Sequence, residues 1–310
     1  MKHKKTEKDN ETNTESEEQN MADDKIMRGT GLLIIEVRDS NPNGDPDRES
    51  DPRQRPDKRG EISPVSFKAK LRSLVENKEG PVWLSLKDTL NLKAERFEIL
   101  ESRQRQKSEI NEDAETFKNK FWDGRLFGNT ELEKGRKVPV RTGVAQFGMG
   151  VSVSPIEIGR YTTTNPPVEK DKAAGMAPLA YRVVHHAVYC MPFFVNPTAA
   201  TKSGCMKEDI NVMLRLIPWA YSHTRSYVRP FVEIRHAWYM EHKSPLGSCS
   251  DFALIDAMKP SRKKDFDPEK PSKSWDEYKV PKAEDIPAEL KNRIKSIRDL
   301  MDEADGTASA

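Results

Sequence analysis

The alternation of apolar and polar residues along the chain predicts a small set of strands and helices. Residues 31–37 (GLLIIEV) are apolar and rich in β-branched side chains, which indicates a buried strand. Over residues 64–77 apolar side chains recur at helical spacing behind Ser63-Pro64, a good helix cap followed by a first-turn proline. The same two patterns predict strands at 183–195 and 231–240 and a helix at 209–221.

The order of these elements indicates the fold class. Strand, helix, strands, helix and strand is the order of a ferredoxin-like β-α-β-β-α-β core, so an α+β fold is expected. Two long segments enlarge this core. Residues 80–116 are charged and predict a helical insertion, whereas residues 152–181 predict a long hairpin that projects from the body.

Both ends of the chain differ in composition from its centre. Residues 1–24 contain almost no apolar side chains and predict a disordered, acidic tail. Residues 259–310 form a charged, proline-rich tail, in which Leu290, Ile294, Ile297 and Met301 predict an amphipathic helix over 288–304. The domain body is therefore expected to span residues 25–258.

Composition narrows the function only slightly. Charged residues make up 33% of the 310-residue chain, above the roughly 25% of an average globular protein. The net charge of +2 is too small to indicate nucleic-acid binding by itself. No apolar run approaches the roughly 20 residues of a membrane helix, and the N-terminus has no apolar signal-peptide stretch. A cytoplasmic protein without membrane contact is expected.

Residues that could ligate a metal are few and badly spaced. Cys190, Cys205 and Cys249 are too far apart for a metal knuckle or a disulfide framework, and we interpret them as reduced thiols. His185 and His186 are neighbours on a predicted strand, so their side chains point to opposite faces. We expect no metal site and no cofactor.

Several motifs occur in an order that resembles a known family. The turn-forming loop Asn41-Pro-Asn-Gly-Asp-Pro-Asp47 follows the first strand. Four further stretches follow this loop in the sequence, at residues 63–75, 121–128, 140–146 and 222–226. A last motif, Leu246-Gly247, follows the final strand. Together they resemble the backbone subunit of type I CRISPR-associated Cascade complexes, the Cas seven subunit, in its Csd/Csh branch of the RAMP superfamily. The resemblance covers residues 25–258.

The resemblance implies a fold, a function and partners. The fold would be an enlarged RNA-recognition motif with an inserted helical region and a thumb hairpin, for which residues 152–181 are the candidate. Several copies would polymerise along a guide RNA (crRNA) and present it for base pairing with target DNA. The other partners would be the large Cascade subunit and the subunits that bind the ends of the RNA. The complete complex would serve antiviral defence. The subunit would be non-catalytic.

A protein that coats any guide sequence must contact phosphate and ribose, which requires cationic and polar side chains and exposed backbone N–H groups. We expect Lys68 and Arg72, four residues apart on one helix, to line one groove with Arg141, beside the open face of the sheet. Gly143 would let the backbone approach RNA closely. Some members carry a basic run where this chain has Gly175-Met176-Ala177, and Met176 would instead wedge between bases. The candidate RNA-binding residues are Asn41, Asn43, Arg53, Arg55, Lys68, Lys70, Arg72, Arg125, Arg141, Thr142, Gln146, Met176, His223 and Arg225.

The aspartates near the loop leave two interpretations open. Asp45 and Asp47 can cap turns through hydrogen bonds to backbone N–H groups, which is the usual role of aspartate beside Pro and Asn-Gly. Alternatively, Asp39, Asp45 and Asp47 hold a divalent ion beside the RNA and support its cleavage. The second interpretation makes the chain a metal-dependent, RNA-guided endoribonuclease subunit, as in related type III backbone subunits.

Overall fold

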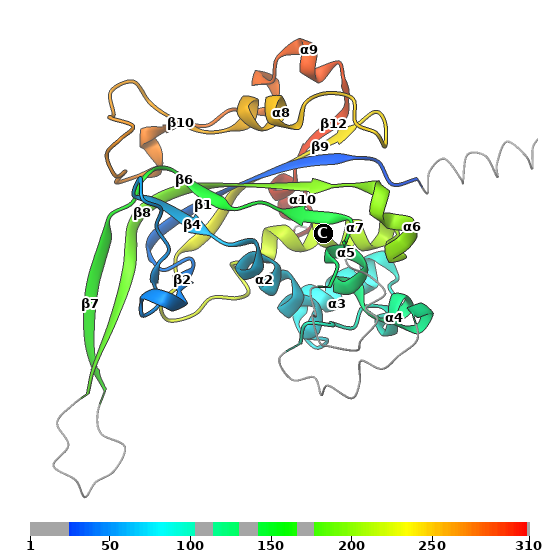
Figure 1. Cartoon of the computed structure of the whole chain (residues 1–310), viewed down its shortest axis with the longest axis horizontal. Helices are drawn as coiled ribbons and strands as arrows, with labels where there is room; N and C mark the ends of the chain where they lie inside the picture. Colours follow the sequence, from blue (N-terminus) through cyan, green and yellow to red (C-terminus); the bar gives the residue numbers. More distant parts are fainter. Residues whose placement is uncertain (1–24, 103–113, 130–141, 166–176, 309–310) are drawn as a thin grey trace, which may run out of the picture.

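A large antiparallel sheet forms the centre of the molecule. The computed structural model describes residues 25–102, 114–129, 142–165 and 177–308. Within them, eight strands make one sheet whose main order is β12-β9-β1-β8-β6-β4, with β5 and β7 also paired to β8. Figure 1 shows helices on one side of this sheet and a C-terminal segment on the other. The predicted tail 1–24 and the residues Arg141 and Met176 lie outside the described residues.

The strands match most of the sequence pattern. Every residue of 31–37 is buried, because layers cover both faces of β1. Strand β1 pairs with β8 on one side and β9 on the other, both antiparallel. The strands are β1 Gly29–Ser40, β4 Arg59–Ile62, β5 Ala145–Phe147, β6 Gly150–Pro155, β7 Ile158–Asn165, β8 Ala177–Val195, β9 Val232–His242 and β12 Ile294–Asp299.

Helices cover one face of the sheet. Helix α2 begins where Ser63 Oγ accepts a hydrogen bond from the Ser66 N–H (3.2 Å), followed by Pro64 in its first turn. Its apolar stripe packs with that of α7 against the β1 side chains Leu33, Ile35 and Val37. The helices are α2 Pro64–Glu76, α3 Pro81–Leu90, α4 Ala114–Lys120, α5 Trp122–Phe127, α6 Ala200–Ser203, α7 Lys207–Leu216 and α10 Leu300–Ala308.

The C-terminal segment covers the opposite face. Leu32 and Ile34 of β1 and Trp238 of β9 pack beneath Leu254 and Tyr278 of this segment. The segment contains α8 (Asp251–Met258), the paired strands β10 (Ser261–Arg262) and β11 (Tyr278–Lys279), and α9 (Ala288–Lys291). The expectation of an open sheet face is therefore wrong, because scattered apolar residues of the proline-rich tail bury that face.

The predicted helix over 288–304 is also wrong. Residues Ile294–Asp299 form β12, which pairs with the edge of β9, and only the flanking residues are helical. The Asp299 carboxylate accepts a hydrogen bond from the Ala237 N–H of β9 (2.9 Å). An edge strand offers unpaired backbone groups, and β-branched Ile294 and Ile297 suit a strand that occupies this edge.

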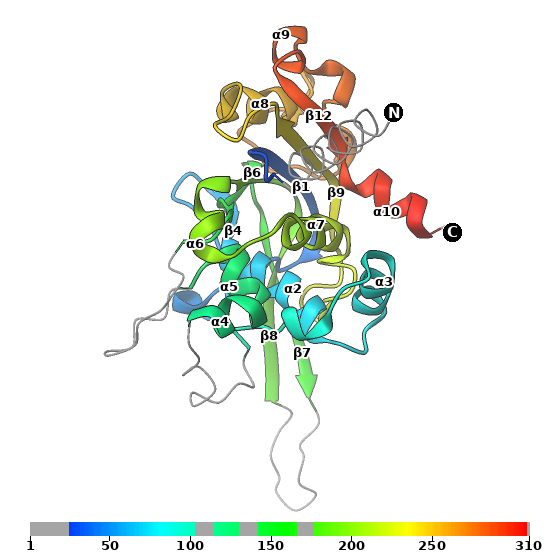
Figure 2. The ribbon, with the colours of Figure 1, turned by 90° about the vertical axis from the view of Figure 1, so that its right-hand side faces the viewer.

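The predicted hairpin is represented by a long antiparallel ribbon. Strands β7 and β8 pair from Ile158↔Val184 to Asn165↔Ala177, and the tip of the segment lies outside the described residues. Both views show the ribbon projecting away from the sheet and helices (Figures 1 and 2). Of the predicted insertion 80–116, residues 80–102 and 114–116 are described, and their helical parts are α3, a 3-10 turn (Ala94–Arg96) and the start of α4.

The described residues contain no helix long and apolar enough to cross a membrane. The three cysteines are unpaired, and burial raises the pKa of Cys190 to about 12, which keeps its thiol protonated.

Candidate nucleic-acid interface

The loop after β1 is a compact hairpin held against α2. It consists of β2 (Gly44–Asp45), a 3-10 turn (Pro46–Arg48) and β3 (Asp51–Pro52). Asn43 Oδ1 accepts a hydrogen bond from the Ser63 N–H (2.7 Å), and Asn41 Nδ2 donates to the Ser50 carbonyl (2.7 Å). The amide groups of both predicted RNA-binding asparagines therefore shape the loop, which fixes its position relative to the helix.

The aspartates of this loop make local bonds. Asp45 Oδ1 accepts a hydrogen bond from the Asp47 N–H (3.2 Å) and lies 3.9 Å from the Arg53 guanidinium. Asp39 adopts a positive φ of 38° and pairs with His185 (3.1 Å). Within the described part of the chain, no three His, Cys, Asp or Glu residues are grouped closely enough to hold a metal. Asp45 thus caps the turn that the sequence pattern predicts.

Arginines follow the loop at its rim. Arg53 has the distant partner Asp45, and Arg55 forms a close ion pair with Glu61 (2.6 Å) in which 40% of the arginine side chain is exposed. Ion pairs this exposed are weak. Both predicted RNA-binding arginines therefore lie at the surface and can exchange partners.

Lys68 and Arg72 share one side of α2. Of the two, Arg72 forms ion pairs, whereas Lys68 has no ion-pair partner among the described residues. Their cationic groups lie 5.6 and 5.3 Å from the centroid of the Phe127 ring, so the predicted common face is present. Arg72 is buried and pairs with Asp123 (2.8 Å) and Glu101 (3.0 Å). The expectation that Arg72 offers its charge to a groove is wrong, because two carboxylates neutralise it inside the fold.

Arg125 is also internal. It is fully buried, donates to both carboxylate oxygens of Asp209 (3.0 and 2.6 Å), and donates to the carbonyls of Lys118 and Arg96 (2.7 and 2.9 Å). This network ties α5 to the first turn of α7. The prediction that Arg125 lies on an RNA-binding surface is therefore wrong. The aromatic residues that surround it in 121–127 were the sequence pattern that indicated burial.

Lys70 and Arg229 are neighbouring cations, and neither forms an ion pair with a carboxylate of the described residues. Only 6% of Lys70 is exposed, and its ammonium makes one long hydrogen bond to Thr224 Oγ1 (3.4 Å) above the Tyr221 ring. Burial and the charge of Arg229 lower the pKa of Lys70 to about 8. Arg229 Nε donates to the Asn41 carbonyl (3.0 Å). Neither residue has an ion-pair partner in the described ranges, and we refer to them as the cation pair. Sequence reasoning missed Arg229.

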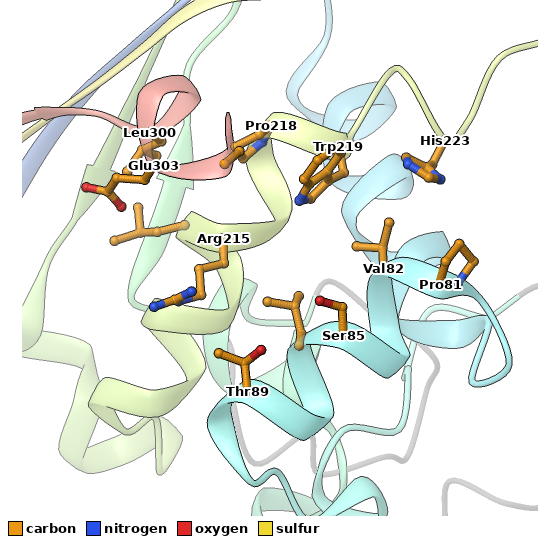
Figure 3. Close-up of a pocket in the computed structure, with 13 residues that line it drawn as sticks. Pro81, Val82, Ser85, Thr89, Arg215, Pro218, Trp219, His223, Leu300 and Glu303 are labelled. Carbon is orange, nitrogen blue, oxygen red and sulfur yellow. The ribbon is translucent and has the colours of Figure 1, made fainter. Parts of the chain in front are cut away.

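His223 and Arg225 lie on the connection that carries Thr224. Both are exposed, and Arg225 has no ion-pair partner within the described residues. The His223 ring packs on Trp219 (centroids 5.6 Å apart) at the rim of a cavity of about 500 Å³ between α3, α7 and α10 (Figure 3). Apolar side chains such as Val82, Leu86 and Leu300 line much of this cavity, so it is unsuited to phosphate.

The glycine-bordered stretch after Arg141 has another role than predicted. A Cβ on Gly143 would lie 2.3 Å from backbone atoms of Leu126, Phe127 and Gly128, so the glycine permits close packing of two protein segments. The expectation that Gly143 lets nucleic acid approach is therefore wrong. Thr142 and Gln146 are exposed, and Gln146 Nε2 donates to the Gly143 carbonyl (3.3 Å).

The fold is a mixed α/β architecture around a large antiparallel sheet, with cationic residues gathered near one end of β1. Comparison with known families assigns it further: the family model described as CRISPR-associated protein Cas7 matches residues 27–282. The chain belongs to this family, which confirms the resemblance found in the sequence. No curated protein sequence matches the chain.

Two solved structures are similar to this chain over most of their length. A chain of a "CRISPR RNA-guided surveillance complex, pre-nicking" is 14% identical, with 69% of this chain and 75% of that chain covered and a TM-score of 0.45. A chain of a "CRISPR RNA-guided surveillance complex" is 15% identical, with 75% of each chain covered and a TM-score of 0.44.

Proposed function

We propose that this Cas7-family chain is a backbone subunit that binds CRISPR guide RNA through its phosphates. Further copies and other subunits would assemble on the same RNA and present it to complementary DNA. Family membership over residues 27–282 supports this function. The observation that carries the RNA contact is the cation pair, because two adjacent cations without a carboxylate partner among the described residues can both bind one anion from outside the chain.

The chemistry of the cation pair suits a phosphate. An ammonium group has three donors, and Lys70 uses one of them in a bond of 3.4 Å. The charge of Arg229 disfavours the protonated form of Lys70, and a phosphate placed between them would reverse this effect. A phosphate contact reads no base, as a subunit that accepts any guide requires.

The topology supports an enlarged ferredoxin-like core. The order β9-β1-β8-β6, with α2 after β1 and α7 after β8, is the order 4-1-3-2 of that fold. Because the C-terminal segment covers the outer face of this sheet, we place RNA at the end of β1, along α2 and the connection 222–229. The β7–β8 ribbon is our candidate for the thumb.

We propose a non-catalytic, cytoplasmic subunit. Asp45 is used to cap a turn, and nothing in the described loop favours the alternative of a metal-dependent ribonuclease. Intact RNA after long incubation with Mg²⁺ or Mn²⁺ is the expected result. Cleavage that is lost in Asp45→Ala, with binding preserved, would contradict it.

Two measurements test the proposed function: the identity of the RNA that copurifies with the protein, and the dependence of RNA affinity on sequence and salt. The purified protein is expected to carry short RNAs with uniform repeat-derived ends. In binding assays, unrelated RNAs of equal length should bind with nearly equal affinity, and this affinity should fall steeply with salt. Strong preference for one sequence, or affinity that is indifferent to salt, would exclude binding through phosphates.

The pKa of Lys70 predicts how RNA affinity depends on pH. Phosphate should hold Lys70 protonated in the complex, whereas the free protein loses this proton near pH 8. Binding above pH 8 must therefore take up a proton, and the affinity should fall as the pH rises from about 7 to 9.5, by up to about tenfold per pH unit. Fluorescence anisotropy at constant ionic strength measures this dependence.

Lys70→Arg is the matched control, because arginine stays charged throughout this range. Its RNA affinity should change little between the same pH values. Identical pH profiles for the wild type and Lys70→Arg would show that Lys70 does not contact phosphate.

A further inference from the structure

The motif Leu246-Gly247 presents an apolar side chain to solvent, since Leu246 is 91% exposed. The Gly247 N–H donates to the Ser244 carbonyl (3.0 Å), and its φ of 97° is one that glycine adopts readily. The buried ring of His242 anchors the same loop, because its Nδ1 accepts a hydrogen bond from the Ser248 N–H (3.0 Å). A turn with a fixed backbone therefore holds Leu246 outward.

A second large apolar side chain lies beside this turn. Phe252, in the first turn of α8, is 78% exposed, and it borders the same shallow pocket of about 620 Å³ as Leu246. Single exposed apolar residues need no explanation, whereas large neighbouring ones are typical of an interaction surface. We call Leu246 and Phe252 the exposed apolar patch.

The cavity between α3, α7 and α10 offers a matching apolar surface on the other side of the sheet. Its volume of about 500 Å³ is in the range of cavities that enclose a ligand, and Trp219 lies at its rim (Figure 3). The buried side chains Val82, Leu86 and Leu300 line it. Because α8 and this cavity lie on opposite faces of the sheet, the exposed apolar patch cannot enter the cavity of its own chain (Figures 1 and 2).

The charges beside the two surfaces are opposite in sign. Arg293 borders the pocket at the exposed apolar patch, and both it and nearby Lys243 are exposed and have no ion-pair partner among the described residues. At the cavity, α10 begins with the exposed carboxylates of Asp302 and Glu303. Arg215 lines the cavity on its α7 side, so the complementary charge is confined to the α10 side.

We propose that the exposed apolar patch of one copy inserts into the cavity between α3, α7 and α10 of the next copy. The proposal rests on the proposed function and names the surfaces through which neighbouring copies contact each other. Contact between two different surfaces is heterologous, and its repetition builds an open series of subunits unless it closes into a ring. A series of copies along one RNA requires an interface of this kind.

A second copy is favoured over another occupant for two reasons. Every copy carries both surfaces, on opposite faces of the sheet, so each copy can contact one neighbour on either side. The apolar contacts and the complementary charges would also be formed together, because Arg293 adjoins the exposed apolar patch and α10 adjoins the cavity.

Binding to two RNAs, one that accommodates a single copy and one that accommodates two, tests the proposal. Phe252→Ala shortens the exposed apolar patch, and Ser85→Trp fills the cavity, since Ser85 is exposed and lines it. Both variants should bind the shorter RNA like wild type. On the longer RNA, the second copy of either variant should bind about 5- to 150-fold more weakly than the second copy of wild type. Mass photometry counts the copies on each RNA.

Two matched controls should behave like wild type on both RNAs. Ser85→Ala leaves the cavity open, and Phe231→Ala removes an exposed ring (62%) that belongs to neither surface. Equal melting temperatures establish that the variants are folded. If Ser85→Trp melts at a lower temperature, Thr89→Trp replaces it, because Thr89 is also exposed and lines the cavity.

A mixture of the two variants tests whether the two surfaces contact each other. The Ser85→Trp protein keeps its exposed apolar patch, and the Phe252→Ala protein keeps its open cavity. One of each, in one order along the RNA, therefore forms a complete interface. The mixture should bind the longer RNA as pairs more tightly than either variant alone does.

Each remaining outcome overturns a defined claim. If wild type binds both RNAs but its second copy binds no more tightly than that of the variants, the interface is wrong while the proposed function stands. A mixture that binds as weakly as each variant alone would show that the two surfaces do not contact each other, and the interface is again wrong. If the wild type binds neither RNA, the proposed function itself fails.

Discussion

The Arg125→Ala protein is expected to be about 3–5 kcal/mol less stable than the wild type, because the substitution leaves the buried carboxylate of Asp209 without its cation. Asp209 Oδ2 also accepts a hydrogen bond from the Met206 N–H (2.9 Å) at the start of α7, so the loss would loosen this helix end as well. Two carbonyls, of Lys118 and Arg96, would lose their donor at the same time. Urea unfolding followed by circular dichroism measures the difference.

Arg55→Ala is the matched control for this measurement. It also removes an arginine from an ion pair, but the pair with Glu61 is solvent-exposed, and the stability should fall by no more than about 1 kcal/mol. An Arg125→Ala protein that is as stable as the wild type and binds RNA more weakly would restore the sequence-based interpretation of Arg125 as an RNA contact.

The second large effect is expected at the C-terminal segment. Leu254 of α8 is fully buried against the outer face of the sheet, and Leu254→Ala should reduce the free energy of unfolding by about 2–5 kcal/mol. Phe252 lies on the same helix but is 78% exposed, so Phe252→Ala should change stability by less than about 0.5 kcal/mol. The same urea titrations compare the two variants.

Equal, small effects of the two substitutions would show that α8 does not cover the sheet. The outer face would then be free to bind RNA, as the sequence led us to expect. A large effect of Leu254→Ala alone supports RNA binding at the end of β1 instead.

Periodicity predicted the central elements because packing and local preference agree there. The strand at 31–37 and the helix at 64–77 correspond to β1 and α2, whose apolar residues face a common core. At residues 294–299, local preference and packing favour different structures. The apolar spacing suits a helix, but pairing with the edge of β9 makes this segment a strand. An interaction with a strand more than 50 residues earlier leaves no local pattern in the sequence.

The candidate site shows a similar limit for charged residues. The spacing of Lys68 and Arg72 predicts that they lie on one side of a helix, and the structure confirms this arrangement. Spacing does not reveal whether a carboxylate from another part of the chain lies on that side. Asp123 neutralises Arg72 and lies 51 residues away in the sequence, and Asp209 lies 84 residues from Arg125. Lys70 is distinguished from these arginines only by the lack of such a partner.

The central claim is that RNA phosphates bind the cation pair, and the salt dependence of RNA affinity tests it most directly. The slope of log affinity against log salt is measured for wild type, Lys70→Ala, Arg229→Ala and Lys295→Ala, at pH 7 and with one single-stranded RNA. Lys295 is an exposed cation on β12, paired with Glu241 (2.6 Å), and serves as the control. We expect the slope to become shallower by about 0.7 in Lys70→Ala and in Arg229→Ala and to stay unchanged in Lys295→Ala. Wild-type slopes in both cation-pair variants would contradict the account.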